Sequence, residues 1–345
     1  MDRTTKPIRP APTVQDVARE ANVSTATVSR CINLPEKVGE ETRKRVLKVI
    51  ADIGYAPNFG ARALVAKRTN TIGAIIPTME NAIFARGLQA FQEELGRNGY
   101  TLLVASSSYR PDLEEEQIRT LLARGADALL LIGFDRRPEI TEMLRERGVP
   151  HLVAWAHDPA SRTPSVGFDN RTAMSDLARK VIAFGHRQIA MISAPTQSND
   201  RARDRVAGVR DAAAAHGLDP DAITVVETPY SFENGGNAFR TLMNGSPRPT
   251  AVICGNDILA IGAMSMATEM GLGIPQDVSI TGFDDIEVAR VVTPRLTTVH
   301  VPHREMGRLS AAALIALLRD DMPDAHTQLL TEVILRRTLG SPRSA

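Results

Sequence analysis

Residues 13–33 have the sequence TVQDVAREANVSTATVSRCIN, in which two short helical patterns flank a tight break. Thr13 begins a capping pattern that includes Asp16, and Ser24 stands where the cap of the second helix is expected. Two short helices joined in this way cross at a steep angle, so the second can enter the major groove of DNA. The stretch therefore predicts a helix-turn-helix unit, with a plain helical hairpin as the alternative.

The second helix is expected from Thr25 to about Asn33, and its N-terminal side chains would face the base edges. Arg30 can form a bidentate pair with guanine, and Ala26 can only touch a thymine methyl group. These residue types suit direct reading of a DNA sequence.

Charge is concentrated in this part of the chain. Residues 1–70 hold 13 Lys and Arg against 7 Asp and Glu, a net charge of +6, whereas residues 71–345 carry −5. This distribution favours binding of a polyanion by the basic residues 1–70 and not by the mildly acidic remainder. An ordinary solvated basic face would have the same charge, so charge alone leaves both open.

From residue 71 onward, apolar runs of strand length alternate with helical patterns. Repeated alternation of this kind predicts parallel sheets with helices on both faces. Eight such units exceed one comfortable core, so an α/β domain of two doubly wound lobes is expected. The predicted strands are 71–77, 101–106, 128–133, 151–156, 189–194, 223–227, 251–255 and 279–283.

Several classes of protein are not indicated. No apolar run is long enough to cross a bilayer, and residues 1–7 lack the apolar stretch of a signal peptide. Cys31 and Cys254 lie too far apart in sequence for a disulfide framework, which favours a reducing compartment. We therefore expect a cytoplasmic protein with no membrane contact.

An enzyme is the main rival class. The loop after the first predicted strand has no Gly-x-Gly-x-x-Gly fingerprint, and no Walker pattern occurs in the chain. The histidines are scattered without the spacing of metal ligands. The sequence thus predicts neither catalysis, nor a cofactor, nor a metal.

The headpiece pattern resembles that of the lactose/galactose/purine repressor family of bacterial transcriptional regulators. The resemblance runs from Thr13 to about Leu339. It implies a regulator, expected to repress, that binds a near-palindromic operator as a homodimer under the control of a small-molecule effector. Further motifs that carry it are 38–43, 53–58, 61–64, 185–189, 205–208, 249–252, 256–257, 282–285 and 293–299.

The resemblance also divides the chain. The lobes would be periplasmic-binding-protein-like, the first at about 71–168 with 301–328 and the second at 169–300 with 329–340. The expected regions are a disordered arm (1–12), an all-α helix-turn-helix headpiece (13–57), a hinge helix and linker (58–70) and an effector-binding and dimerisation domain (71–340).

In this family the hinge becomes helical on operator DNA. Leu64 would then wedge into the minor groove and kink the duplex. A plain linker, with Leu64 packed on the sensor, is the alternative. The residues expected to contact DNA are Thr13, Val14, Ser24, Thr25, Ala26, Thr27, Ser29, Arg30, Asn33, Tyr55, Asn58, Ala61, Arg62 and Leu64.

The resemblance places the effector between the lobes, at the carboxyl ends of the strands. Arg205 and Asp284 match positions that commonly bind effector, although Asp284 could instead cap a helix. Trp155, the only tryptophan, could stack on a sugar ring or only fill a lobe core. The residues expected at the site are Asn81, Phe84, Ser106, Trp155, Asn199, Arg201, Arg205, Asn256 and Asp284.

Three arginines crowd the start of one predicted helix, and Arg201 and Arg205 would share a helical face there. Arginine forks suit carboxylate or phosphate, which favours a sugar acid or a phosphorylated sugar over a neutral sugar. An equally open alternative is that Arg201, Arg203 and Arg205 pair with Asp200, Asp204 or Asp211.

Overall fold

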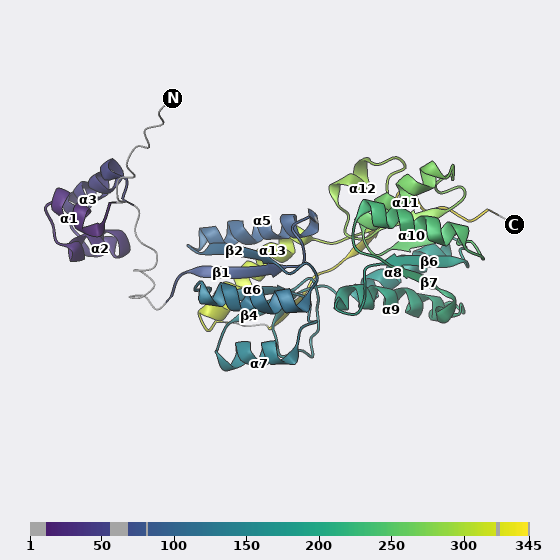
Figure 1. The fold of residues 1–345 in the computed structure, drawn as a ribbon, viewed down its shortest axis with the longest axis horizontal. Coiled ribbons are helices and arrows are strands. Elements are labelled where there is room, and N and C mark those ends of the chain that lie inside the picture. Colours follow the sequence, from purple (N-terminus) through teal and green to yellow (C-terminus); the bar gives the residue numbers. More distant parts are fainter. Residues whose placement is uncertain (1–11, 56–67, 81, 322–324, 344–345) are drawn as a thin grey trace, which may run out of the picture. The chain divides into compact units, whose positions relative to one another are not determined.

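The computed structural model describes residues 12–55, 68–80, 82–321 and 325–343. The chain divides into two compact units, Met1–Thr69 and Asn70–Ala345. The described part of the first unit is all-α (Figure 1). Its helices are α1 (Val14–Glu20), α2 (Thr25–Asn33) and α3 (Glu40–Ile53), with the short 3₁₀ helix η1 (Pro35–Lys37) between α2 and α3.

The helix ends lie where the sequence predicted them. The Thr13 hydroxyl accepts from the Asp16 amide at 3.3 Å, and the Asp16 carboxylate accepts from the Thr13 amide at 2.9 Å. This backbone hydrogen bond from Thr13 lowers the pKa of Asp16 to about 2. Ser24 caps α2 by accepting from the Thr27 amide at 3.1 Å. Gly54 ends α3 with a left-handed φ of 68°, a conformation that glycine adopts without strain.

A very small core holds the three helices together. The Arg45 Nε donates to the Ala21 carbonyl at 3.1 Å, which ties α3 to the turn between α1 and α2. On α2, Val28 and Cys31 are buried, and the half-buried Ile32 packs against the same core. The buried core residues are Val17, Ala18, Ala21, Val28, Cys31 and Val46.

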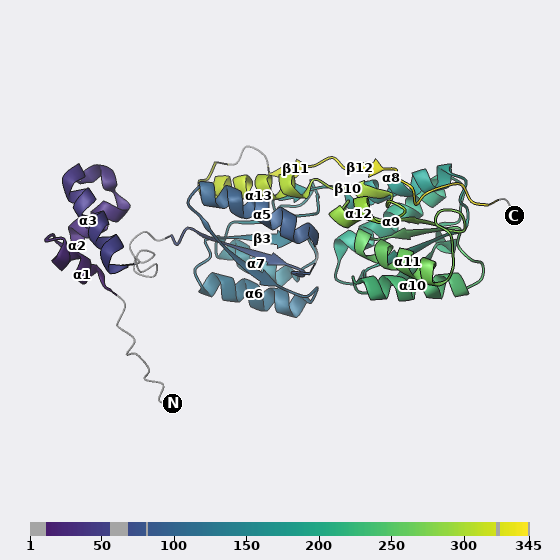
Figure 2. The ribbon, with the colours of Figure 1, turned by 90° about the horizontal axis from the view of Figure 1, so that it is seen from above.

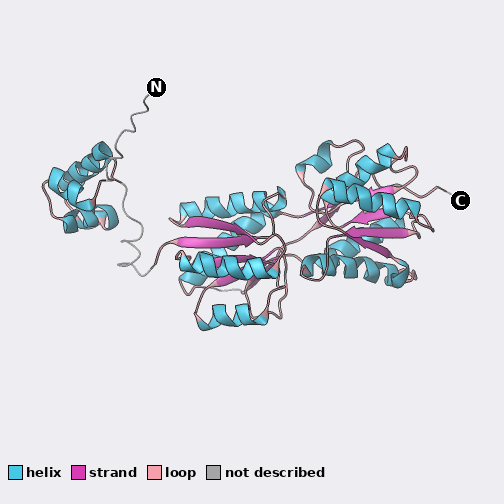
Figure 3. Ribbon diagram, in the orientation of Figure 1, coloured by secondary structure: helices cyan, strands magenta, loops and turns pink. Residues whose placement is uncertain are grey.

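The second unit contains two parallel sheets, each with helices on both faces (Figure 3). The sheet of the first lobe has the strand order β11-β5-β4-β3-β1-β2. Its strands are β1 (Thr71–Ile76), β2 (Thr101–Ser106), β3 (Ala128–Ile132), β4 (His151–Ala154), β5 (Ser165–Gly167) and β11 (His326–Gln328). Its helices are α5 (Ala82–Arg97), α6 (Pro111–Ala123), α7 (Pro138–Glu146) and α13 (His303–Leu318).

The sheet of the second lobe has the strand order β7-β6-β8-β9. Its strands are β6 (Ile189–Ser193), β7 (Thr224–Glu227), β8 (Ala251–Cys254) and β9 (Ser279–Thr281). Its helices are α8 (Asn170–Ala183), α9 (Asp200–Ala215), α10 (Phe232–Asn244), α11 (Asp257–Glu269) and α12 (Glu287–Val291), with the 3₁₀ helix η2 (Pro220–Ala222). A separate antiparallel pair is formed by β10 (Thr298–His300) and β12 (Glu332–Ile334).

Strand β1 shows how one sheet serves two cores. Ile72, Ala74 and Ile76 join the cluster on the side of α5 and α13, whereas Ile75 joins the cluster on the side of α6 and α7. Side chains that alternate along a strand point to opposite faces, so apolar residues at both sets of positions require helices on both faces. The predicted doubly wound architecture is therefore confirmed.

The chain passes between the lobes three times, from β5 to α8, from β10 to α13 and from β11 to β12 (Figure 2). Helix α13 and strand β11 thus belong to the first lobe, and the chain then returns to the second lobe at β12. Within the described ranges, no helix combines the length and the apolar character that a bilayer crossing needs. The same residues contain no cluster of three or more His, Cys, Asp or Glu side chains suited to a metal ion.

Candidate functional site

A cavity, here called the inner chamber, lies between the two lobes. Its empty volume, counted together with the solvent space that adjoins it, is about 310 Å³, of which about 20 Å³ can hold the centre of a water molecule. Both lobes contribute to its wall. The lining residues are Ile83, Phe84, Tyr109 and Trp155 from the first lobe and Asn199, Arg201, Arg205, Tyr230, Asn256 and Asp284 from the second.

Arg205, on α9, is held from several sides and is only 4% exposed. Its Nε donates to the Asn170 Oδ1 at 2.9 Å, and its Nη1 donates to the Gly255 carbonyl at 2.7 Å. Its guanidinium carbon lies 3.9 Å from the centroid of the Phe283 ring, a cation–π contact. The Nη2 lies 3.8 Å from the Asp284 Oδ1, which is too far for a hydrogen bond. The Arg205 guanidinium is therefore fixed in place, with its Nη2 beside the Asp284 carboxyl group.

Asp284 is a buried carboxyl in a strained conformation. It is 2% exposed and has a left-handed φ of 105°, and its Oδ1 has no hydrogen-bond partner. Burial raises the pKa of Asp284 to about 7, although the nearby Arg205 opposes this shift. The alternative that Asp284 caps a helix is wrong, because α12 has Ile286 at its N-cap and no side-chain cap. A strained, unpartnered carboxyl on a cavity wall is typical of a ligand contact.

Two asparagines of the wall begin helices. The Asn199 Oδ1 accepts from the Ala202 amide at 3.3 Å at the start of α9, and the Asn256 Oδ1 accepts from the Leu259 amide at 2.9 Å at the start of α11. Each cap uses the amide oxygen; the Asn199 side chain also hydrogen-bonds Tyr230, so Asn256 is the asparagine whose NH₂ group faces a ligand without a side-chain partner of this kind.

The aromatic part of the wall is centred on Trp155, which is only 1% exposed. Its ring centroid lies 5.4 Å from that of Phe84, and its Nε1 donates to the His303 Nδ1 at 3.2 Å. Burial lowers the pKa of His303 to about 3, so the neutral imidazole accepts this bond. Gly87 leaves room for the indole, since a Cβ there would lie 2.5 Å from it. Trp155 thus fills the lobe core and also lines the chamber.

Arg201 shares its face of α9 with Arg205 and pairs with Asp200 at 2.7 Å. The other Asp200 oxygen accepts from the Phe134 amide of the first lobe at 2.5 Å. Gly133 permits this approach, because a Cβ at that position would lie 1.7 Å from the Arg201 Nη1. The predicted alternative that Arg201 pairs with Asp200 is therefore confirmed.

Arg203 also has a carboxylate partner, although not one that the sequence suggested. Its Nη1 and Nη2 donate to the two oxygens of Asp135 at 2.9 and 2.8 Å. Asp135 follows β3, so this bidentate pair joins the two lobes at the edge of the cleft.

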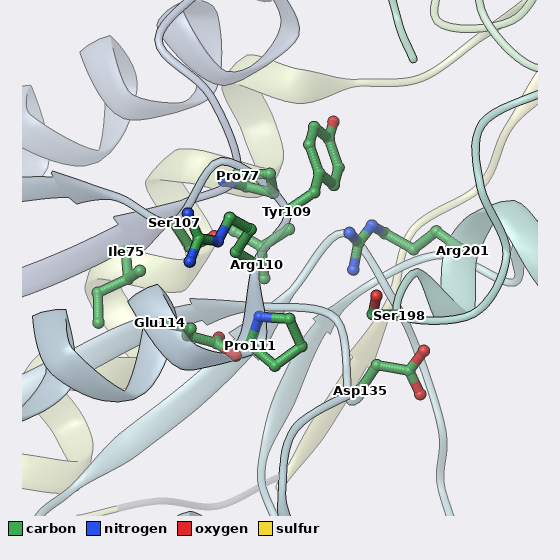
Figure 4. Close-up of a pocket in the computed structure, with 11 residues that line it drawn as sticks. Ile75, Pro77, Ser107, Tyr109, Arg110, Pro111, Glu114, Asp135, Ser198 and Arg201 are labelled. Carbon is green, nitrogen blue, oxygen red and sulfur yellow. The ribbon is translucent and has the colours of Figure 1, made fainter. Parts of the chain in front are cut away.

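A second cavity, here called the outer chamber, shares Tyr109 and Arg201 with the inner one (Figure 4). Its empty volume is about 370 Å³. Arg110 and Pro111 at its edge are exposed, so the outer chamber is open to solvent. The lining residues are Ile75, Pro77, Ser107, Tyr109, Arg110, Pro111, Glu114, Ile132, Asp135, Ser198 and Arg201.

The inner chamber brings together most of the predicted effector residues, namely Phe84, Trp155, Asn199, Arg201, Arg205, Asn256 and Asp284. Ser106 lines neither chamber, because its hydroxyl donates to the Pro77 carbonyl at 3.2 Å, and its neighbour Ser107 lines the outer one instead. Asn81 lies outside the described residues. Sequence reasoning missed Ile83, Tyr109 and Tyr230, although Tyr109 follows β2 at the same sheet edge.

The headpiece displays most of the predicted DNA-contacting side chains. Thr13, Ser24, Thr25, Ala26, Ser29 and Arg30 are exposed, and Val14, Thr27 and Tyr55 are half-buried. Tyr55 also packs against the headpiece core, which gives it a structural role. The side chain of Asn33 and the whole of Asn58, Ala61, Arg62 and Leu64 lie outside the described residues.

Comparison with known proteins shows what this combination belongs to. Residues 13–58 match the model for bacterial regulatory proteins of the lacI family, and residues 178–339 match a periplasmic binding protein-like domain. Catabolite control protein A of Priestia megaterium is 31% identical over 313 residues, which cover 91% of this chain and 94% of that protein. The transcriptional repressor PurR of Salmonella paratyphi B is 35% identical over 306 residues, which cover 88% and 89%.

Solved structures agree along almost the whole chain. The lac repressor dimer bound to operator and the anti-inducer ONPF matches with a TM-score of 0.86 and 26% identity, covering 96% of this chain and 100% of that one. The complex of the transcriptional regulator CelR with cellobiose matches with a TM-score of 0.69 and 28% identity, covering 95% and 99%. These relatives are transcriptional regulators and not enzymes. This chain belongs to the lacI family of bacterial regulatory proteins.

Proposed function

We propose that the chain represses transcription by binding a near-palindromic operator as a homodimer, and that a sugar acid in the inner chamber controls its operator affinity. The observation that carries the proposal is the chamber between the two lobes, with Arg205 and Asp284 buried on its wall. A ligand there contacts both lobes and can favour one lobe arrangement over another. Because the partner of the headpiece is DNA, we place the protein in the cytoplasm.

The donors of the inner chamber favour an anion. Arg205 carries a positive charge, and Asn256 offers its NH₂ group. Asp284, with a pKa of about 7, can hold a proton and donate as well. Phe84 and Trp155 provide apolar faces for a carbon chain or ring. A carboxylate with several hydroxyls matches this set.

A neutral sugar is the second candidate. The charge of Arg201 is balanced by Asp200 at 2.7 Å, which reduces what it offers an anion. The related CelR structure holds cellobiose, a neutral disaccharide. A phosphorylated sugar, the remaining possibility, would need donors for two negative charges.

Two arguments support a homodimer: the geometry of operator binding and an exposed apolar face. One headpiece has too small an interface for tight specific binding, and a two-fold dimer places two recognition helices on a near-palindrome. A groove between α10 and α11 is lined by Ile261 and Met266 and edged by Phe232, which is 51% exposed. The related lac repressor structure is a dimer. An isologous contact at this groove would cover Phe232.

Trp155 provides the test of the effector class, because it is the only tryptophan and lines the chamber. We expect hexonic acids to change its fluorescence at concentrations about tenfold lower than the matching neutral hexoses, since a charged hydrogen bond adds about 1.5 kcal/mol or more. The same acids should raise the melting temperature of the full chain. Tighter binding of the neutral hexoses, or of hexose phosphates, would select those candidates instead.

Arg30→Ala tests sequence reading by the headpiece. Arg30 is exposed on α2, so its side chain is placed to reach a base. The substitution should weaken binding to the operator by about 1–3 kcal/mol and binding to random DNA much less. Gel-shift titrations on both DNAs give the two values. An equal loss on both would assign Arg30 to a phosphate.

A further inference from the structure

Two tyrosines form the least buried part of the inner chamber. Tyr109 and Tyr230 are half-buried, whereas all the other lining residues are buried. Tyr109 lies between β2 and α6 in the first lobe, and Tyr230 lies between β7 and α10 in the second. Their ring centroids are 5.7 Å apart with an interplanar angle of 52°. The pair therefore closes the chamber across the boundary between the lobes.

The backbone at Tyr109 is strained. Ser108 and Tyr109 have left-handed φ values of 51° and 58°, two in succession without a glycine. Such a conformation persists only where its surroundings enforce it. Glycine would adopt this backbone freely but would place no ring in the cleft. The strain thus holds an aromatic side chain at this point.

Tyr109 also separates the two chambers. Together with Arg201 it lines both of them, and Arg201 is fixed above Gly133 by its pair with Asp200. The outer chamber is open to solvent along its exposed edge. Tyr109 and Arg201 therefore lie where the two chambers adjoin.

We propose that Tyr109 determines the length of the effector: its ring confines the ligand to a single small unit in the inner chamber, and its loss joins the two chambers into one longer site. The class of ligand in this inference rests on the proposed function. The separation of the two chambers by Tyr109, here called the partition, does not. The joined site would accept a sugar acid that carries a second sugar ring, because the outer chamber offers Ser107, Glu114 and Ser198 as hydrogen-bonding partners.

Tyr109→Asn is the variant of choice, since asparagine tolerates the left-handed backbone and removes the ring. Tyr109→Phe is the matched control that keeps the ring. The first measurement is acrylamide quenching of Trp155, which needs no effector. Trp155 is 1% exposed in the chamber, so we expect more quenching in Tyr109→Asn and no change in Tyr109→Phe. Tyr230→Ala, which opens the same wall from the second lobe, should also increase quenching.

The second measurement is a fluorescence titration of the full chain with a hexonic acid and with a hexonic acid that carries a second sugar ring. Wild type and Tyr109→Phe should bind only the shorter acid. Tyr109→Asn should bind the shorter acid about tenfold more weakly, because an aromatic contact is lost, and should gain binding of the longer one.

The outcomes separate the inference from the proposed function. Unchanged quenching in both Tyr109→Asn and Tyr230→Ala would overturn the partition, whatever the ligand is. Increased quenching in a protein that binds neither acid would support the partition and contradict the sugar-acid class. If Tyr109→Asn keeps the wild-type preference for the shorter acid alone, Tyr109 does not determine the effector's length.

Discussion

The affinity of the wild-type protein for a sugar acid is expected to fall about tenfold for each pH unit above the pKa of Asp284, which is about 7. Burial raises this pKa, and a bound carboxylate nearby would raise it further. The anion therefore binds together with a proton, which Asp284 then donates to it. Above pH 7 this proton has to be taken up from solvent, so binding weakens.

Asp284→Asn should abolish this dependence, because the side-chain NH₂ group donates at every pH. Asparagine also tolerates the left-handed backbone at this position, where φ is 105°. Titrations with a sugar acid at pH 6, 7 and 8.5, followed by Trp155 fluorescence, give the slope of the logarithm of affinity against pH. The expected result is constant affinity for the variant, and about 30-fold weaker binding at about pH 8.5 than at about pH 6 for wild type.

Asp204→Asn is the control for this experiment. Asp204 lies on α9 next to Arg205, and burial raises its pKa as it does that of Asp284, but Asp204 lines neither chamber. It should leave the wild-type slope unchanged. A slope in Asp284→Asn equal to that of wild type would show that Asp284 gives the anion no proton, and a neutral sugar would then be the better candidate.

The headpiece could be predicted from sequence because its signals are local. The caps at Thr13 and Ser24 and the glycine at Gly54 each act within a few residues, and the periodicity between them is helical. The lobes were predictable for a similar reason, since long apolar runs alternate with helices. Strands β5 and β11 have three residues each and lie outside the apolar runs, so the sequence did not indicate them.

The chamber was predictable only in part. Residues directly after strands, such as Trp155 and Asn256, meet at one sheet edge, so their order in the chain reveals them. Tyr109 is placed by two left-handed residues in succession, and no sequence pattern signals that conformation at Ser-Tyr. The pairing of Arg203 with Asp135 depends on how the lobes meet, which local patterns do not contain.

Arg205→Ala should lower the free energy of unfolding by about 3–5 kcal/mol, the loss typical of breaking a buried charged network. The substitution removes the donors to Asn170 and Gly255 and leaves Asp284 without its nearby positive charge. It also leaves a void beside the Phe283 ring. The loss should appear in urea denaturation of the full chain.

Arg203→Ala is the matched control, two residues away on the same helix. Arg203 also pairs with a carboxylate, but its side chain is 49% exposed and that of Asp135 is 29% exposed. A surface pair of this kind contributes only about 0–1 kcal/mol, so the variant should unfold almost like wild type. An equal loss of unfolding free energy in the two variants would show that the burial of Arg205 does not explain its contribution to stability.

Because Arg205→Ala is expected to lose stability, its failure to respond to effector would reflect damaged structure as well as a lost ligand contact. Arg205→Lys, which keeps the positive charge but lacks the planar guanidinium, is therefore the variant that tests ligand recognition.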